Sequence, residues 1–256
     1  MRLVVETFIR PHIPFLDSNA MPWTQLAPGL YSKMLSRDGE SGARTALNRL
    51  VPAPDTPVPS KAHFHHTNEE LLIVSGCMSF DSETWLTPGS YVFHPSQTVH
   101  GFKSAVREET QFLSRVGRNL DFNWVDHPLQ RKPYYVSASP PARTVTYIPE
   151  PQMLTWQPEP KAQGKVERAV LSRDPQTGEG SMFLRFAPGA LTNAAANLRS
   201  FQEMFILDGD LVTGDGRVFR QGCYAFWPAI NTPKPSLSAR QSSLIYLNVG
   251  GWVEGE

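Results

Sequence analysis

The chain has 256 residues, enough for two domains of ordinary size, and its 24 Lys and Arg residues balance its 24 Asp and Glu residues. Zero net charge and the absence of Lys/Arg runs argue against a nucleic-acid partner, which usually requires a basic patch. No apolar run approaches the roughly 20 residues of a membrane helix, and the N-terminus lacks the apolar core of a signal peptide. We therefore expect a cytoplasmic protein that does not bind membranes.

Short apolar runs closed by glycine or proline predict an all-β chain. The 23 prolines and 18 glycines are spread along the sequence rather than clustered. Runs rich in Val, Ile, Leu, Phe and Tyr lie between them, at residues 70–74, 90–93, 204–207 and 243–249. Such runs are typical strands of a sandwich or barrel, and no long stretch has the apolar period of a helix.

The sequence repeats itself once. A shift of 133 positions aligns residues 63–117 with 196–250 without a gap. The identical pairs include Glu70 with Glu203, Gly76 with Gly209, Gly89 with Gly222, Tyr91 with Tyr224, Phe93 with Phe226 and Pro95 with Pro228. Upstream, a shift of 136 aligns residues 35–38 with 171–174, both LSRD, and the difference falls in a loop at 52–63. We predict one fold built twice, over residues 1–135 and 136–256, joined near the Pro-rich segment 128–144.

Three histidines and one glutamate in the first half form a candidate metal site. His63 and His65 are two positions apart, so both imidazoles face the same side of a strand. Glu69 has the same parity if that strand continues without a bulge. His100 follows a turn at Gly89 and a strand at 91–93, and strand pairing can bring it opposite the first two histidines. Such a set suits Fe(II), Zn(II), Mn(II), Ni(II) or Cu(II) and leaves one or two coordination positions open.

The neighbouring candidates have weaker arguments. Glu70 has the opposite parity to Glu69, and its match to Glu203 favours a structural role in both halves. A one-residue bulge would exchange the two glutamates, so Glu70 remains an alternative ligand. His66 has the wrong parity, and His94 is interpreted as structural. Phe102 shares the parity of His100 and is predicted to contact a substrate.

These residues resemble a known family. His63, His65, Glu69 and Gly76 match the spacing H-x-H-x3-E-x6-G of the first cupin motif. Gly89, Pro95 and His100 resemble the second motif, with Gln97 where the family usually has glycine. The run 23–100 is most similar to the ChrR-like cupins, through Trp23, Pro28, Gly29 and the strand 47–52. The resemblance implies two tandem cupin barrels, which are double-stranded β-helices or jelly rolls. We expect no counterpart of ChrR's anti-sigma domain.

The second half has lost the candidate ligands. Under the shift of 133, the four positions become Ala196, Leu198, Gln202 and Pro233. We therefore expect one divalent ion per chain, in the N-terminal domain. The C-terminal domain would serve packing, by covering the first barrel, by forming a homodimer interface or by shaping the pocket. A separate small-molecule site in the second barrel is the alternative.

Three functions are compatible with this sequence. The resemblance implies an enzyme, a non-haem Fe(II) dioxygenase that cleaves a small chelating carbonyl or phenolic substrate, with Fe2+ as the favoured ion. Glu69 would then be a ligand or a catalytic base. The alternatives are a non-catalytic sensor of a metal or small ligand, and a Zn or Mn enzyme of non-redox type, such as a lyase or isomerase.

Overall fold

The computed structural model describes residues 10–53, 58, 61–160, 162–192, 200–228 and 235–250. In these ranges the chain forms 25 β-strands and two short 3-10 helices, η1 (Ser18–Ala20) and η2 (Pro151–Met153), and no α-helix. The all-β prediction is confirmed. Within the described part of the chain, neither helix has the length and apolar character needed to span a membrane.

Each half builds one large antiparallel sheet of seven strands. The first sheet has the order β14 (Thr146–Ile148), β8 (Tyr91–His94), β6 (Glu69–Ser75), β11 (Thr110–Val116), β4 (Arg44–Leu50), β3 (Leu30–Arg37) and β2 (Thr24–Ala27). The second has the order β1 (Ile13–Asp17), β23 (Cys223–Trp227), β20 (Gln202–Asp208), β25 (Ser243–Val249), β18 (Gly180–Phe186), β17 (Val166–Arg173) and β15 (Gln157–Pro158). The two orders correspond strand by strand, as the internal repeat predicts.

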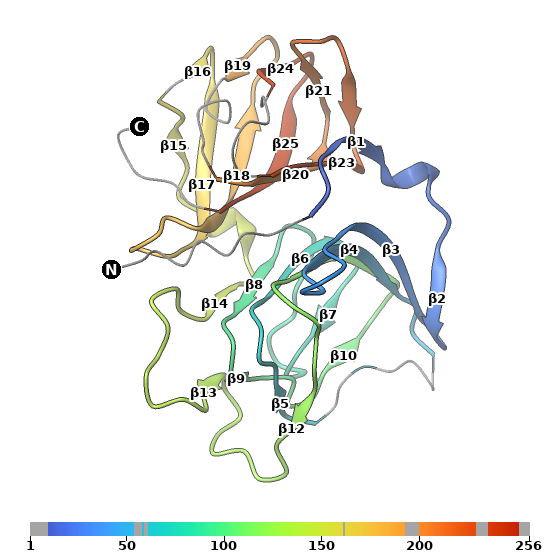
Figure 1. Cartoon of the computed structure of the whole chain (residues 1–256), viewed down its shortest axis with the longest axis vertical. Coiled ribbons are helices and arrows are strands. Elements are labelled where there is room, and N and C mark those ends of the chain that lie inside the picture. Colours follow the sequence, from blue (N-terminus) through green and yellow to red (C-terminus); the bar gives the residue numbers. More distant parts are fainter. Residues whose placement is uncertain are drawn as a thin grey trace.

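Smaller sheets complete two jelly-roll barrels, which lie one above the other (Figure 1). In the first half, pairs form between β5 (His63–Phe64) and β12 (Asn123–Trp124), β7 (Met78–Ser79) and β10 (Ala105–Val106), and β9 (Thr98–Val99) and β13 (Tyr134–Tyr135). In the second half, one sheet joins β16 (Ala162–Gln163), β19 (Leu191–Thr192), β24 (Leu237–Ala239), β21 (Asp210–Thr213) and β22 (Val218–Arg220).

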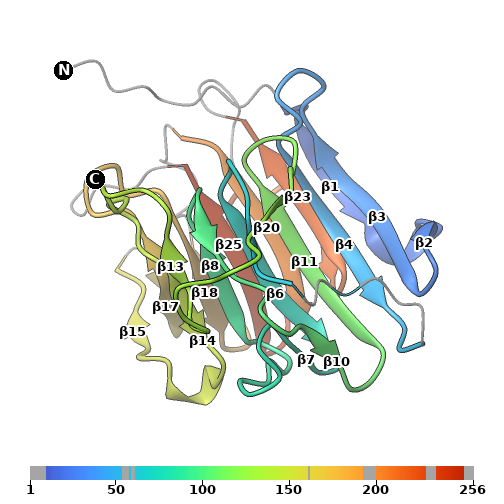
Figure 2. The same cartoon turned by 90° about the horizontal axis from the view of Figure 1, so that it is seen from below.

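Strand alternation sends neighbouring side chains into different cores. Along β6, Leu71 and Ile73 pack inside the first barrel, whereas Leu72 packs between the two large sheets. The layer between the sheets joins residues of both halves, among them Tyr91, Phe93, Phe205, Tyr224 and Phe226. Figure 2 shows the strands of the two sheets running alongside one another. The apolar face expected on the second half is therefore covered by the first.

The two halves exchange their first strands. β1 pairs with β23 of the second half, with Leu16 opposite Tyr224, and β14 pairs with β8 of the first half, with Tyr147 opposite Val92. The exchange is reciprocal, because β1 and β14 are equivalent strands of the two halves. They begin at Ile13 and Thr146, which are 133 positions apart (146 − 13), the shift of the internal repeat. The domain boundary near residue 135 remains a prediction, and each barrel contains a strand from the other side of it.

A buried cluster of charges also joins the halves. Glu203 accepts hydrogen bonds from Arg10 and Arg115, each at 3.1 Å. Glu70 contacts Arg143 at 2.9 Å and Arg115 at 3.3 Å. The arrangement follows the repeat, since Arg10 and Arg143, like Glu70 and Glu203, are 133 positions apart. Glu70 thus faces the interface rather than the barrel interior, where it cannot bind an ion together with the histidines.

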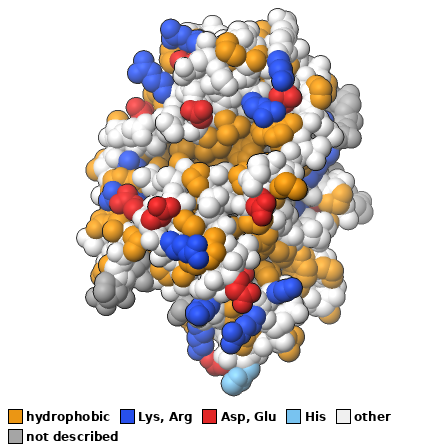
Figure 3. Space-filling model, turned by 180° about the vertical axis from the view of Figure 1, so that it is seen from behind, with side chains coloured by type: hydrophobic (Ala, Val, Ile, Leu, Met, Phe, Trp, Pro, Cys, Tyr) orange, Lys and Arg blue, Asp and Glu red, His pale blue; other side chains and the backbone are white. Residues whose placement is uncertain are grey.

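The face of the molecule shown in Figure 3 mixes charges of both signs. In Figure 3, Lys and Arg side chains are interspersed with Asp and Glu, and hydrophobic side chains are visible between them. The largest exposed apolar side chains of the described residues include Leu26, Phe122 and Trp124, all in the first half.

Candidate metal centre

Two short backbone segments bring the candidate ligands together. His63 and His100 form an isolated antiparallel bridge, in which each backbone N–H donates to the other residue's carbonyl, at 3.0 and 2.9 Å. His100 therefore lies opposite His63, as expected. Glu69 does not continue the strand of His63, because β5 ends at Phe64 and β6 begins at Glu69. All four side chains, His63, His65, Glu69 and His100, are buried.

Each of the three imidazoles is oriented by the backbone. The Nδ1 atom of His63 lies 2.9 Å from the carbonyl of Lys61, and Nδ1 of His100 lies 2.9 Å from that of Thr98. Nδ1 of His65 contacts the carbonyl of Asp121. Because a carbonyl can only accept, Nδ1 must carry the proton in each ring. The Nε2 lone pairs are thus free for a ligand, which is the usual arrangement around a metal ion.

The spacing of the donor atoms fits one divalent ion. His63, His65 and His100 offer ring nitrogens that lie within 4.8 Å of one another. Oε2 of Glu69 lies 3.3 Å from Nε2 of His100 and 3.9 Å from Nε2 of His65. Two ligands bound about 2.1 Å from the same ion are separated by roughly 3–4 Å, so the side chains need little movement to hold one. This buried His/Glu cluster can hold a metal ion.

His94 belongs to the same cluster, although no pattern in the sequence distinguishes it as a ligand. In the sheet it lies directly opposite Glu69. Its Nδ1 is 3.3 Å from Oε2 of Glu69, its Nε2 is 2.6 Å from the hydroxyl of Tyr147, and its ring stacks on His100 at 3.9 Å. Glu69, His94 and His100 form a second set of atoms close enough for one ion. His94 therefore connects the carboxylate to a tyrosine contributed by the exchanged strand β14.

Burial favours the neutral imidazoles of His63, His65 and His94, and the carboxylate of Glu69 is charged. Burial, followed by the charge of His100, lowers the pKa of His63 to about 4, and the same two causes lower the pKa of His94 to about 3. Burial opposes ionisation of Glu69, but its contacts with His100 and His94 outweigh it and hold its pKa well below the usual value. Neutral imidazoles beside a carboxylate are the protonation states that metal binding requires.

Two turn residues hold His63 and His65 in place. Gln97, at the position where cupins usually carry glycine, adopts a left-handed φ of 64° and donates its N–H to the carbonyl of His65 at 2.7 Å. The turn is therefore formed despite the substitution, at a cost of about 1–2 kcal/mol. Gly101 has a φ of 73°, and a Cβ there would lie 2.5 Å from Cε1 of His63. Only glycine fits at that position.

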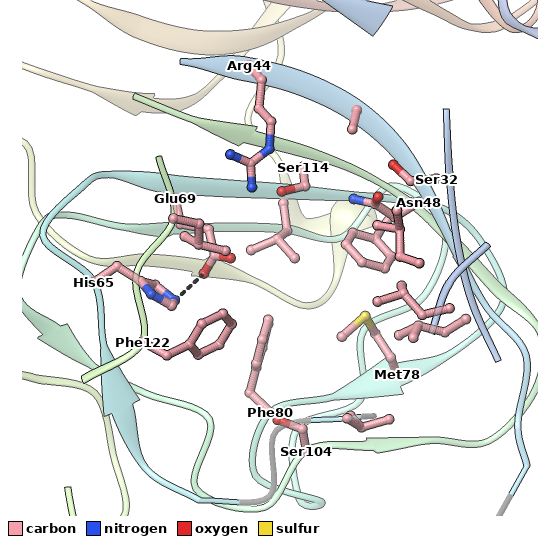
Figure 4. Close-up of a pocket in the computed structure, with 18 of the residues that line it drawn as sticks. Ser32, Arg44, Asn48, His65, Glu69, Met78, Phe80, Ser104, Ser114 and Phe122 are labelled. Carbon is pink, nitrogen blue, oxygen red and sulfur yellow. Dashed lines mark ion pairs between the residues drawn. The ribbon is translucent and has the colours of Figure 1, made fainter. Parts of the chain in front are cut away.

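The cluster lies at one end of a cavity of about 450 Å³ inside the first barrel. Figure 4 shows His65, Glu69 and Phe122 around one part of it and Met78, Ser32 and Asn48 farther away. Most of the wall is apolar, with Leu50, Leu71, Met78, Phe80, Phe112 and Phe122 among the lining residues. A cavity of this size, apolar with a few polar groups, is typical of small-molecule sites.

Phe102 is not among the described residues that line this cavity. Its side chain is half-buried, and the parity argument from His100 fails because the left-handed Gly101 interrupts the alternation. Phe80 and Phe122 take the place expected for Phe102: the Phe80 ring is 6.0 Å from the His100 ring, and the Phe122 ring is 4.9 Å from the His65 ring. A substrate contact by Phe102 remains a prediction without support from the cavity.

The second barrel is filled where the first is hollow. Ala46, Asn48 and Ser114 line the cavity, and their counterparts Met182, Leu184 and Leu247 are packed into the core of the second barrel. Gln202, the counterpart of Glu69, is buried. Ala196, Leu198 and Pro233 lie outside the described residues. Within the described ranges, the second half has no cluster of three His, Cys, Asp or Glu residues suited to a metal.

Comparisons with known proteins agree with this fold. Residues 14–118 match the model of the ChrR cupin-like domain. No curated protein sequence matches the chain. Among solved structures, a candidate dioxygenase from Nostoc punctiforme is 18% identical with a TM-score of 0.70, and the match covers 93% of this chain and 82% of the other.

Two further structures share the fold. Salicylate 1,2-dioxygenase from Pseudaminobacter salicylatoxidans is 15% identical with a TM-score of 0.57, over 86% of this chain and 76% of the other. Protein YlbA from E. coli is 17% identical with a TM-score of 0.59, over 95% and 94%. Identities this low show the fold alone. Together with the matched domain and the two jelly-roll barrels, they show a chain with the cupin fold in both halves and a ChrR cupin-like domain over residues 14–118.

Proposed function

We propose that this protein is a metal-dependent enzyme, a non-haem Fe(II) dioxygenase that cleaves a small chelating carbonyl or phenolic substrate. The observation that carries the proposal is the set of three imidazoles and one carboxylate at the end of an apolar cavity. Nitrogen and oxygen donors without a thiolate accept Fe(II), although Zn(II), Mn(II), Ni(II) and Cu(II) also suit them.

The residues have separate roles in this proposal. His63, His65, Glu69 and His100 would hold one ion and leave room for substrate on the cavity side. Bound Fe(II) would activate O2 and act as a Lewis acid toward the chelating oxygens of the substrate. Phe80 and Phe122 would position an apolar body beside the ligands and exclude water. Glu69 would act as a ligand or as the base that removes the proton of a phenol or enol.

The direct test is oxygen consumption by protein loaded anaerobically with Fe(II). A panel of β-diketones, hydroxy-ketones, catechols and hydroxybenzoates would be mixed with the loaded protein, and an oxygen electrode would record uptake. We expect substrate-dependent uptake with at least one compound, and none with Zn(II)-loaded protein or with His63→Ala. If the Fe(II) protein consumes no oxygen with any of them, the dioxygenase proposal is wrong.

Glu69→Gln separates the two roles proposed for Glu69. The substitution keeps the shape and removes the charge, as Gln202 does in the second barrel. If Glu69 is a ligand, the affinity for the metal should fall about tenfold or more, in line with losses seen for outer-shell changes. If Glu69 is a base, the metal should stay bound and turnover should fall by roughly 10²–10⁴. Metal titration and kinetics on the same preparation give both values.

A non-redox lyase or isomerase is the second candidate, and one observation favours it. Glu69, His94 and Tyr147 form a chain from the buried cluster to β14, through contacts of 3.3 and 2.6 Å. Such a chain can carry a proton to or from a substrate without oxygen. Turnover of a hydroxy-ketone by the Zn(II) or Mn(II) protein under anaerobic conditions would favour this candidate. Ligand binding without turnover would favour a sensor.

A further inference from the structure

One cation stands in the wall of the apolar cavity. Arg44 begins β4 and lines the cavity together with Glu69 and Ser114. In Figure 4 its side chain points from β4 into the space that these two residues also face. Its side chain is half-buried rather than extended into solvent. A cation in such a place requires an explanation, because removing a guanidinium from water is unfavourable unless an anion compensates it.

The guanidinium of Arg44 has no hydrogen-bond acceptor or ion-pair partner among the residues that the structure describes. The fully buried arginines of the described residues behave differently: Arg10, Arg115 and Arg143 each contact a glutamate in the cluster between the barrels. Burial and the charge of Arg37 lower the pKa of Arg44, and the charge of Glu69 opposes them. The carboxylate of Glu69, in the metal centre, is thus close enough for its charge to act on Arg44.

Sheet register explains this proximity. Arg44 lies opposite Val116, and Val116 lies opposite Glu69, so the three residues form one row across β4, β11 and β6. Directly opposite residues of an antiparallel sheet project from the same face. Two strand spacings separate the backbones of Arg44 and Glu69, which is roughly 10 Å. A small molecule that touches the metal ligands is therefore within reach of the long Arg44 side chain.

Charge balance indicates what Arg44 would bind. A divalent ion and Glu69 leave the centre with one positive charge, and Arg44 adds a second. Among the lining residues that the structure describes, Glu69 is the only acid. An apolar cavity with two uncompensated positive charges favours an anionic ligand. The guanidinium fork matches a carboxylate, with which it forms paired hydrogen bonds.

Comparison with the second barrel indicates that the fold does not require an arginine at the position of Arg44. Under the shift of 136, Arg44 corresponds to Gly180. A Cβ at Gly180 would lie 2.4 Å from the carbonyl oxygen of Ser172, so no side chain fits there. The barrel whose interior is filled thus lacks the cation, and the barrel with the hollow interior has it.

We propose that Arg44 binds the carboxylate of the substrate, and that the substrate is an apolar acid, such as an aromatic one, with a second oxygen that reaches the metal. This inference rests on the proposed function for its metal contact and deepens it by naming the substrate class. The carboxylate would contact Arg44, the apolar body would lie between Phe80 and Phe122, and a hydroxyl or carbonyl oxygen would reach the ion.

Binding to Zn(II)-loaded protein tests this without requiring turnover. Salicylate and salicylamide are matched probes, because both have a phenol and a carbonyl but only salicylate is an anion. Calorimetry would measure both with native protein, Arg44→Gln, Arg44→Lys and Arg37→Gln. Arg37 is the matched control, since it is exposed, lies opposite Arg44 on β3 and does not line the cavity.

We expect native protein to bind salicylate roughly 10- to 100-fold more tightly than salicylamide, the range for a hydrogen bond to a charged group. Arg44→Gln should abolish this preference, Arg44→Lys should retain part of it, and Arg37→Gln should leave it unchanged. A preference that survives in folded, metal-loaded Arg44→Gln would overturn the proposal, because the metal would then bind the carboxylate. Equal binding of both probes by native protein would also overturn it. Neither result depends on oxygen chemistry, so the dioxygenase proposal stands or fails separately.

Discussion

At the scale of single residues, the centre is organised by main-chain carbonyls. The carbonyls of Lys61, Thr98 and Asp121 each fix one imidazole. The carboxylate of Asp121 also accepts a hydrogen bond from the backbone N–H of His66 and contacts the His66 ring. Because main-chain atoms orient the rings, loss of one ring should not disturb the other two. Metal affinity and folding can therefore be separated by substitution.

His63→Ala and His100→Ala should each lose most of the bound metal and still fold. Native protein should contain about one divalent ion per chain, because the second barrel has lost its ligands. Elemental analysis after loading and desalting measures both. A chelator should lower the melting temperature of native protein but not of the variants, since an ion that binds only the folded state stabilises it.

His66→Ala is the control for these variants, because His66 is exposed and pairs with Asp121 rather than with the cluster. It should retain the full metal content. About two ions per chain in native protein, or unchanged metal in His63→Ala, would contradict the predicted site.

Sequence parity predicted part of this site. The spacing of His63 and His65 and the return of His100 are properties of short segments, and the structure brings these residues together. His94 and Arg44 were not predicted, because each owes its place to the strand beside it. The opposition of His94 and Glu69, and the row from Arg44 to Glu69, depend on the register between strands. Register is set by turns and packing across the whole sheet, and no local pattern encodes it.

At the scale of elements, β1 is the most consequential strand. It covers β23, which would otherwise be the edge of the second sheet, and Arg10 just before it reaches Glu203. An uncovered edge strand exposes unpaired N–H and C=O groups that template association with other chains. The first strand of the chain thus protects the second barrel.

A chain that begins at Ser18 should melt at a lower temperature and form oligomers. It lacks the strand that covers β23 and Arg10, one of the two arginines that pair with Glu203, so the edge is uncovered and part of the charge compensation is lost. Thermal melts and light scattering after size exclusion measure the two effects. A chain that begins at Arg10 is the matched control. A monomeric truncated chain with an unchanged melting temperature would show that β1 has no such role.

The repeat predicted that the two halves share one fold, but it did not predict which strands pair between them. Matching glycines and aromatic residues placed corresponding strands in the two halves. The repeat is equally compatible with an arrangement in which β1 pairs with β8 and β14 pairs with β23, because the two strands occupy equivalent positions in the two halves. Which sheet each strand joins depends on the packing of the two barrels against each other, as in the layer that includes Phe205 and Phe226. That packing is not visible in either half alone.

At the scale of the whole molecule, the two barrels form one folding unit. The layer between their sheets is apolar, and the charged cluster within it is shared, with Arg115 contacting both Glu70 and Glu203. Removing one partner from a buried ion pair is far more damaging than replacing the whole pair. Neither half can be removed without leaving such a partner.

The second half expressed alone, from Thr144, should aggregate. It would expose Phe205, Tyr224 and Phe226, and Glu203 would lose both of its arginines, which come from the first half. Co-expression with residues 1–143 should restore a soluble complex. Size exclusion and thermal melts check this, and a soluble monomeric fragment that melts cooperatively would show that the halves are independent.

The shared charges also predict a dependence of stability on pH. Burial raises the pKa of Glu70, but Arg143 and Arg115 outweigh it and lower the pKa to about 2, below the ordinary value of 4.5. A depressed pKa in the folded state stabilises the fold above pH 4.5, and this contribution is lost as the pH falls from 4.5 toward 2. Urea unfolding should show the loss. Glu70→Gln should be less stable at neutral pH and show a shallower decline, whereas Glu108→Gln, on the surface, should behave like native protein.

The exchange of first strands has a consequence for synthesis on the ribosome. Asp17 pairs with Cys223, which emerges 206 residues later (223 − 17). At about 5–20 residues per second, β1 waits roughly 10–40 s for its partner, whereas β14 can join β8 soon after it is translated. β1, which precedes the other described strands in the sequence, is therefore among the last to be placed. During that interval the nascent chain carries an unpaired strand, to which a chaperone that recognises extended segments could bind.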